Sequence, residues 1–125
     1  MKGHRFVDRL AFAWAGLRTA WRMEKSLRTH ALATLAVVAA LLITRAPAVW
    51  WGVMAVTVAL VVGAELLNTA IEALADHLHP QRHEAIKRTK DVAAAAVLVT
   101  SMGALVVGVA FTLDQVWPLL QRWWP

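Results

Sequence analysis

A stripe of polar side chains runs along one face of a predicted helix inside an otherwise apolar stretch. The stripe consists of Glu65, Asn68, Glu72 and Asp76. Steps of three, four and four residues place these side chains on the same side of an α-helix. A charged group in the bilayer costs about 2.5 to 3.5 kcal/mol on insertion scales, so acids in line require pairing, water or a metal ion. The stripe therefore indicates a functional site; the alternative is hydrogen bonding between helices that stabilises an oligomer.

Carboxylates and basic groups near this stripe have the chemistry needed to hold a nucleotide. If Glu24 approaches Glu72, the two carboxylates form a hard-oxygen site suited to Mg²⁺ that carries substrate phosphates. Taken alone, Glu24 is better explained as one half of a solvated ion pair among arginines. Lys90 and Asp91 open a later helix, where helix-start amides add positive potential for phosphate oxygens. Taken alone, Asp91 is a first-turn acid that stabilises its helix.

Several other chemistries are excluded or disfavoured by the sequence. The chain has no cysteine, which rules out disulfides, thiolate nucleophiles and cysteine zinc sites. The patterns GxxxxGK[ST], GxGxxG and HExxH are also missing, so any nucleotide site must be built from side chains. Three histidines, His77, His79 and His83, lie in a basic connector with Arg82. We expect them to meet anionic headgroups or nucleotide phosphates rather than a metal ion.

The composition indicates one membrane-embedded domain. Of the 125 residues, 59% are hydrophobic and 17% are charged. Soluble domains have about 45 to 50% apolar and about 25% charged residues. A soluble two-domain enzyme is therefore disfavoured. The net charge of +5 suits anionic lipid, nucleotide or nucleic acid equally, so the positions of the charges must decide among them.

The hydropathy pattern predicts an all-α membrane protein in which an N-terminal interfacial helix precedes three transmembrane helices. The basic amphipathic segment 1–30 carries tryptophan on its apolar side, as helices lying in the membrane interface do. The first apolar run is shorter than the roughly 20 residues of a typical span, so it needs tilting or backward extension. Within the single domain 1–125, the predicted spans are 31–46, 48–78 and 91–114, and the connector is 77–89.

The charges and tryptophans predict the orientation of the chain. Basic residues concentrate in the N-terminal helix and in the connector 77–89, so the positive-inside rule places both in the cytoplasm. Tryptophans collect at the opposite interface, namely Trp50, Trp51, Trp117, Trp123 and Trp124. We therefore expect a bacterial cytoplasmic membrane protein with a cytoplasmic N-terminus and active site.

Three motifs give the chain a specific resemblance. They are GLRTAWRME at 16–24, ELLNTAIEALAD at 65–76 and HEAIKRTKDVAAAAVLV at 83–99. With them the chain resembles the prokaryotic diacylglycerol kinase family, small three-span membrane enzymes that include the undecaprenol kinases. The resemblance covers nearly the whole chain. It implies a homotrimer whose active sites lie at the cytoplasmic interface and are shared between subunits.

The resemblance also implies a role for each matching residue. Glu65 would be the general base for the lipid hydroxyl, with Asn68 helping to position it, and Glu24 and Glu72 would hold Mg²⁺ on ATP. The implied ATP contacts are Arg5, Phe12, Glu24, Glu72, Arg82, His83, Lys90 and Asp91. The implied lipid-substrate contacts are Leu10, Arg18, Trp21, Ser26, Arg28, His30 and Glu65.

Several residues depart from the family pattern, and these differences leave the identity of the lipid substrate open. Phe12 stands where a tyrosine is common, and Ala13 stands where a serine occurs. His30 stands where typical diacylglycerol kinases have an acidic residue. The segment SLRTH at 26–30 resembles the corresponding segment of undecaprenol kinases. We expect Mg²⁺- and ATP-dependent phosphorylation of diacylglycerol to phosphatidic acid, with undecaprenol as a close alternative.

Two readings from other functional classes remain. In a non-catalytic scaffold or an ion-conducting oligomer, the acidic stripe would hold helices together or line a pore. Such a protein has no need of Glu24 together with Lys90 and Asp91. A nucleic-acid binder is disfavoured because the basic residues alternate with lipid-type apolar ones, and no nucleic-acid-binding module is legible.

Overall fold

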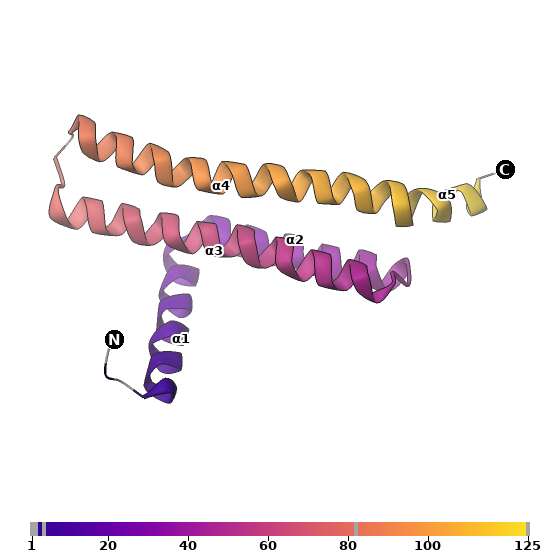
Figure 1. The fold of residues 1–125 in the computed structure, drawn as a ribbon, viewed down its shortest axis with the longest axis horizontal. Helices are drawn as coiled ribbons and strands as arrows, with labels where there is room; N and C mark the ends of the chain where they lie inside the picture. The colour runs from indigo at the N-terminus through magenta and orange to yellow at the C-terminus, as the bar shows by residue number, and fades with distance from the viewer. Residues whose placement is uncertain (1–2, 4, 82, 125) are drawn as a thin grey trace.

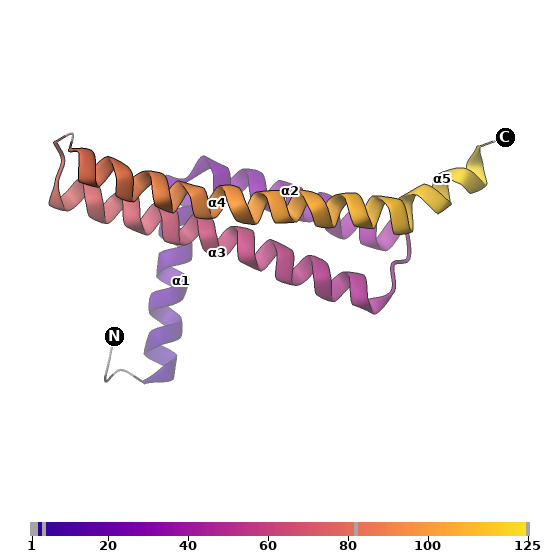
Figure 2. The same ribbon diagram turned by 45° about the horizontal axis from the view of Figure 1, so that its top comes forward.

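Helices make up the fold. The computed structural model describes residues 3, 5–81 and 83–124. Its elements are α1 (Phe6–Met23), α2 (Lys25–Ile43), α3 (Ala48–Leu78), α4 (Glu84–Phe111), the π-helical turn η1 (Thr112–Val116) and α5 (Trp117–Trp123). Helices α2, α3 and α4 run side by side along the long axis, and α1 leaves them crosswise (Figures 1 and 2). The prediction of an all-α fold with an N-terminal helix and three membrane-spanning helices is confirmed.

Three helical segments are long and apolar enough to cross a membrane. They are Lys25–Ile43 with 19 residues, Ala48–Leu78 with 31 residues and Glu84–Trp123 with 40 residues. The last segment includes η1 and α5, which follow α4 without a break in the helix, and α5 turns away from the axis of α4 (Figure 2). A helix of the length of α3 rises about 46 Å, whereas a bilayer has a hydrocarbon core of about 30 Å. The polar end of α3 therefore extends beyond the hydrocarbon.

The chain changes direction at Glu24, earlier than the hydropathy pattern indicated. Glu24 is extended, with φ −112° and ψ 111°, and its N–H bonds to the carbonyl of Ala20 at 2.8 Å. Buried residues Ala20 and Leu27 flank this bend. A helix along the interface and a helix across the bilayer need such a break. Consequently α2 begins at Lys25, and residues 25–30, which the hydropathy pattern groups with the interfacial helix, belong to α2.

The turn between α2 and α3 is closed by backbone hydrogen bonds. Arg45 has φ 51°, in the left-handed region. Its N–H bonds to the carbonyl of Leu42 at 3.2 Å, and the N–H of Ala46 bonds to the carbonyl of Leu41 at 3.1 Å. This pair of bonds satisfies the last carbonyls of α2, as in a Schellman motif. Pro47 then precedes the first residue of α3.

A small apolar core joins the three long helices at the end near this turn. Leu41, Met54 and Phe111 are buried there, one from each of α2, α3 and α4. The ring of Trp50 meets Phe111 edge-on, with centroids 5.2 Å apart, and its Nε1–H donates to Asp114 Oδ2 at 2.8 Å. These contacts set the spacing of the helices at this end, whereas polar side chains join them at the other.

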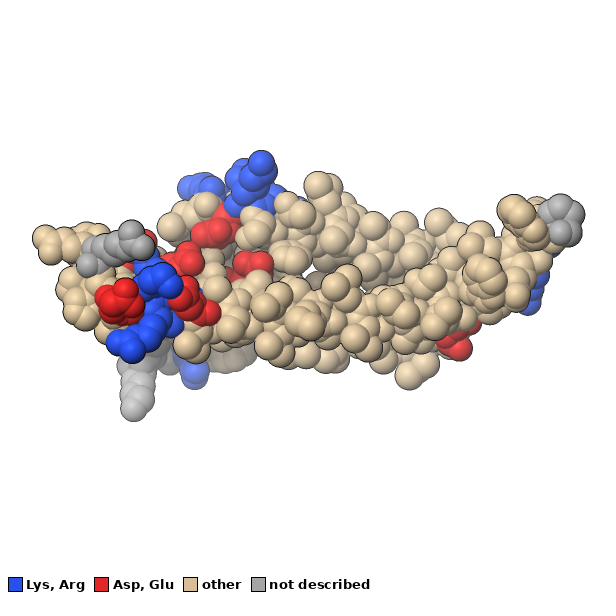
Figure 3. Space-filling model, turned by 90° about the horizontal axis from the view of Figure 1, so that it is seen from above, with Lys and Arg blue, Asp and Glu red and all other residues tan. Residues whose placement is uncertain are grey.

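Charged side chains gather at the end that holds the α3–α4 connection. Figure 3 shows acidic and basic groups mixed there, while the long middle of the visible face carries neither. The sequence has no acidic or basic residue between Arg45 and Glu65, or between Asp91 and Asp114. The candidate site therefore lies at the boundary between an apolar span and a charged end.

Candidate active site

Glu65 is the one buried charged residue in the described part of the chain. Its exposed fraction is 8%, and two side chains of α2 approach its carboxylate. Ser26 Oγ donates to Oε2 at 3.2 Å, and His30 Nε2 lies 3.1 Å from Oε1. Ser26 and His30 are four residues apart, so they lie on the same face of α2. The bend at Glu24 makes this contact possible, because it brings both residues into the helix that packs on α3.

These contacts compensate part of the cost of burying an acid. A buried carboxylate is stabilised when donors meet its oxygens, and each carboxylate oxygen can accept about two hydrogen bonds. One protein donor on each oxygen leaves acceptor capacity for a substrate hydroxyl. A buried acid in this state can bind a hydroxyl group and take its proton.

Asn68 lies one turn beyond Glu65 on α3. Its Oδ1 is buried and has no hydrogen-bond partner among the described residues. The side chain borders a hollow between α3 and α4 whose walls include Gly63, Ala93 and Thr100. An unpaired buried amide oxygen costs about 1 to 3 kcal/mol, so this atom is suited to receive a donor that arrives with a ligand or a second chain.

The carboxylates of Glu24 and Glu72 are free to bind a ligand. Both side chains are partly exposed, and neither has a hydrogen-bond or ion-pair partner within the described residues. Residues 3, 5–81 and 83–124 contain no preformed group of three or more potential metal-binding side chains. Because Mg²⁺ usually takes one or two carboxylates together with water and phosphate oxygens, two free acids match its needs.

Lys90 and Asp91 each have a partner from the charged end. Lys90 Nζ contacts Asp76 Oδ1, which joins the start of α4 to the end of α3. Lys87 Nζ pairs with Asp91 Oδ2 at 2.9 Å within α4. Both pairs are largely exposed, so they exchange readily with an incoming phosphate or metal ion. Asp76, the last residue of the acidic stripe, is therefore the ion-pair partner of Lys90.

His83 caps α4 and borders a polar hollow at the charged end. Its Nδ1 accepts from the N–H of Ala85 at 3.1 Å, and its ring centroid lies 5.2 Å from that of His79. The hollow has a volume of about 350 Å³, and its walls include Asp76, Lys87 and Lys90. It adjoins the first turn of α4, where free amides favour anions. Arg82, the remaining predicted ATP contact of this connector, lies outside the described residues.

The predicted ligand contacts of α1 are exposed side chains. Arg5 pairs with Asp8 at 3.7 Å across an exposed surface. The N-terminal turns of α1 project away from the bundle (Figures 1 and 2). Leu10, Phe12, Arg18, Trp21 and Arg28 are exposed in the single chain. One chain therefore does not bring the N-terminal ATP contacts next to Glu65.

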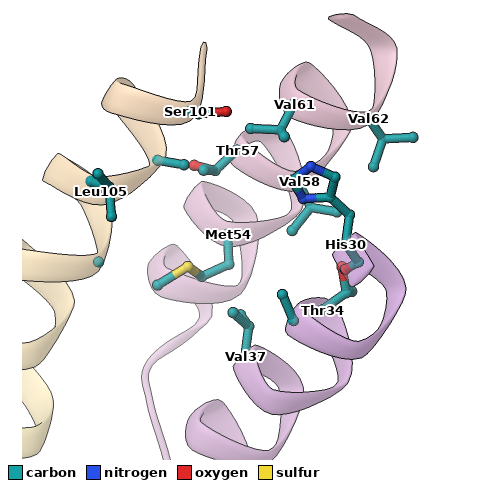
Figure 4. A pocket seen from close by; sticks show the side chains of 13 residues that line it. His30, Thr34, Val37, Met54, Thr57, Val58, Val61, Val62, Ser101 and Leu105 are labelled. Atoms are coloured by element: carbon teal, nitrogen blue, oxygen red, sulfur yellow. The ribbon is translucent and has the colours of Figure 1, made fainter. Parts of the chain in front are cut away.

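An apolar groove begins beside the histidine that contacts Glu65. It has a volume of about 490 Å³ and is lined by α2, α3 and α4. Figure 4 shows His30, Thr34 and Val37 of α2 and Met54, Thr57 and Val61 of α3, with Ser101 and Leu105 of α4 across the groove. The contact between His30 and Glu65 therefore lies at one end of this apolar groove.

Sequence reasoning missed the contact of Ser26 and His30 with Glu65. These two residues were assigned to a lipid-binding region and not to the catalytic acid. The signal was their spacing of four residues, which pairs them on a helix face. It was hidden because the predicted interfacial segment runs to residue 30, whereas α2 begins at Lys25. The pairing of Asp76 with Lys90 had no signal in the local pattern.

Comparison with known proteins identifies the family. Residues 11–112 match the family model described as prokaryotic diacylglycerol kinase. The chain belongs to the prokaryotic diacylglycerol kinase family, which is a family of lipid kinases. All three motifs described above lie within the matched segment.

Some of the relatives are named diacylglycerol kinase, and another is named undecaprenol kinase. The diacylglycerol kinase of Escherichia coli is 35% identical over 109 residues, which are 82% of this chain and 84% of that protein. The diacylglycerol kinase of Synechocystis sp. is 39% identical over 98 residues, or 78% of this chain, and the match spans only 56% of that relative. The undecaprenol kinase of Bacillus subtilis is 29% identical over 112 residues, covering 90% of this chain and 91% of the relative.

Proposed function

We propose that this chain transfers the γ-phosphate of ATP to the hydroxyl of a membrane lipid alcohol, converting diacylglycerol to phosphatidic acid. The observation that carries the proposal is the buried carboxylate of Glu65, held by donors on both oxygens beside an apolar groove. Undecaprenol, which would give undecaprenyl phosphate, is the alternative acceptor. It is supported by the similarity to the undecaprenol kinase of Bacillus subtilis.

Glu65 would act as the general base. The lipid hydroxyl gives its proton to a free lone pair of the Glu65 carboxylate while its oxygen forms a bond to the γ-phosphorus. The bond between this phosphorus and the β–γ bridging oxygen breaks, and ADP leaves with that oxygen. Asn68, one turn away, would help to orient the reacting groups through its unpaired amide oxygen. Positioning and charge stabilisation supply most of the catalysis in phosphoryl transfer.

Glu24 and Glu72 would hold Mg²⁺ with the nucleotide. Their oxygens are of the type that Mg²⁺ prefers, and neither carboxylate has a competing partner among the described residues. Bound Mg²⁺ supplies charge neutralisation to the phosphates. Lys90 would exchange Asp76 for phosphate oxygens, with His83, Asp91 and Arg82 around the nucleotide.

A complete site requires more than one copy of the chain. Arg5 is the N-cap of α1 and Phe12 lies within this helix, which leaves its own bundle crosswise (Figure 1). In the homotrimer that we propose, α1 of one subunit would lie against the bundle of the next. The exposed apolar residues of the single chain would then meet lipid or neighbouring subunits. The concentration of basic residues supports a bacterial cytoplasmic membrane location, with this end in the cytoplasm.

A direct assay tests the proposal. The purified protein in lipid vesicles receives Mg²⁺ and radiolabelled ATP, with diacylglycerol and undecaprenol offered in parallel. Faster labelling of diacylglycerol is expected. Preference for undecaprenol would establish the alternative acceptor. If a folded sample labels neither lipid, the kinase proposal is wrong and the scaffold reading returns.

The apolar groove supports a further expectation about the lipid tail. If a hydrocarbon chain of the substrate lies in the groove, Ala104→Trp should obstruct it, because Ala104 lines the groove on α4. We expect the KM for the lipid to rise about 10-fold, which corresponds to about 1.4 kcal/mol. Binding of ATP, measured by calorimetry, should be unchanged.

Ala110→Trp provides the matched control, because Ala110 is exposed on the same helix and does not line the groove. Ala110→Trp should leave the KM for the lipid and the binding of ATP near their wild-type values. An unchanged lipid KM in folded Ala104→Trp would show that the substrate tail lies elsewhere.

A further inference from the structure

Two side chains of α2 hold both oxygens of a single acid on α3. Ser26 Oγ contacts Glu65 Oε2, and His30 Nε2 contacts Oε1, at 3.2 and 3.1 Å. A single donor leaves a carboxylate free to rotate about its last carbon–carbon bond. Donors on both oxygens fix the plane of the group and the direction of its remaining lone pairs. We call this arrangement of Ser26, His30 and Glu65 the carboxylate clamp.

We infer that His30 is a positioning residue for Glu65, and that Ser26 is the second contact of the same clamp. This inference rests on the proposed function, because it assigns His30 to the base rather than to the lipid. An ionised carboxylate only accepts hydrogen bonds, so in the clamp His30 would donate to Glu65 through Nε2–H. The aligned carboxylate then presents a lone pair to the substrate hydroxyl.

The burial of the two partners supports a role through Glu65. The side chain of Glu65 is 11% exposed and that of His30 is 29% exposed, so the contact is shielded from water on the acid side. Hydrogen bonds to a charged group are among the stronger ones, and a shielded environment strengthens them further. His30 also lines the apolar groove, together with Thr34, Val58 and Val62 (Figure 4). His30 therefore lies between the carboxylate of Glu65 and the apolar groove.

Two variants of His30 with side chains of similar size separate the effect of its hydrogen bond from the effect of its packing. His30→Gln keeps an N–H donor at a similar reach, whereas His30→Leu keeps similar bulk without a donor. In the clamp, His30→Leu should lower kcat by about 10- to 100-fold, the scale of a misplaced reacting group. His30→Gln should restore most of kcat, and the KM values for lipid and ATP should change less than about threefold. Ser26→Ala should show a smaller loss of kcat.

Other outcomes would overturn the inference. If His30→Leu keeps wild-type kcat, the histidine does not position the base. If the lipid KM rises in both variants while kcat is retained, His30 binds the lipid directly. Thr112→Val is the control, since the Thr112 hydroxyl donates to the Gly108 carbonyl four residues earlier, at 2.8 Å, and has no contact with the clamp. It should keep wild-type constants.

A spectroscopic measurement tests the contact without turnover. In protein labelled with ¹⁵N-histidine, the His30 ring signals are assigned by their loss in His30→Gln. They should shift in Glu65→Gln and stay unchanged in Glu84→Gln, which alters an exposed acid on α4. If they do not respond to Glu65→Gln, the clamp is refuted even where the wild-type protein is an active kinase. If they respond but the wild-type protein phosphorylates neither lipid, the proposed function fails and the catalytic role of His30 fails with it.

Discussion

Replacing Glu65 by glutamine is expected to remove phosphate transfer while leaving the fold and ATP binding intact. Glutamine retains the size of the side chain and one oxygen that can accept from α2, but a neutral amide does not take the proton of a lipid hydroxyl. General bases contribute about 10²- to 10⁴-fold, so kcat should fall by a factor in this range. Transfer from radiolabelled ATP measures kcat, and calorimetric titration measures nucleotide binding.

The matched control for this variant is Glu84→Gln. Glu84 is exposed in the first turn of α4, and the substitution makes the same chemical change away from the clamp. It should turn over at the wild-type rate. Near-normal turnover in purified, folded Glu65→Gln would remove Glu65 from the role of base. The polar stripe would then be explained by hydrogen bonds between helices.

Loss of either free carboxylate is expected to weaken the binding of nucleotide in the presence of Mg²⁺. Glu72→Ala and Glu24→Ala each remove one oxygen ligand from the proposed metal site. We expect the Kd for ATP to rise at least about 10-fold with Mg²⁺ present, a change of about 1.4 kcal/mol. The Kd measured with chelator should not change, because these acids would act through the metal. Calorimetry with and without Mg²⁺ separates the two cases.

The double variant and a third acid complete this experiment. If Glu24 and Glu72 hold the same ion, removing both should cost less than the sum of the single losses, because residues that act as a unit are not additive. Glu84→Ala should leave both Kd values unchanged. A metal-dependent Kd equal to that of the wild type in Glu72→Ala would show that Mg²⁺ is held elsewhere.

The position of Glu65 suits a reaction between a water-soluble and a lipid-soluble partner. On one side of its turn of α3 lies the apolar groove between the long helices, and towards the end of α3 lie Asp76 and Lys90. In the proposed reaction, a lipid hydroxyl would reach the acid from the membrane while phosphates would approach from the charged end. An arrangement that served only to join helices would not need both approaches.

Much of the fold was determined by the sequence itself. A membrane-spanning backbone must satisfy its hydrogen bonds internally, so long apolar runs define helices irrespective of their neighbours. The polar stripe from Glu65 to Asp76 was equally legible, because the helical period alone places its members on one face. Local pattern therefore supplied the element that carries the proposed base.

The tertiary structure decided which side chains meet. The bend at Glu24 has no proline or glycine to mark it, and it moved Ser26 and His30 into the bundle. These residues lie 39 and 35 positions from Glu65 in sequence, so no local pattern could pair them. Contacts across helices depend on the rotation and spacing of whole helices, which are set by the packing of many side chains at once. The partners of Glu65 and of Lys90 follow from that packing and not from any single motif.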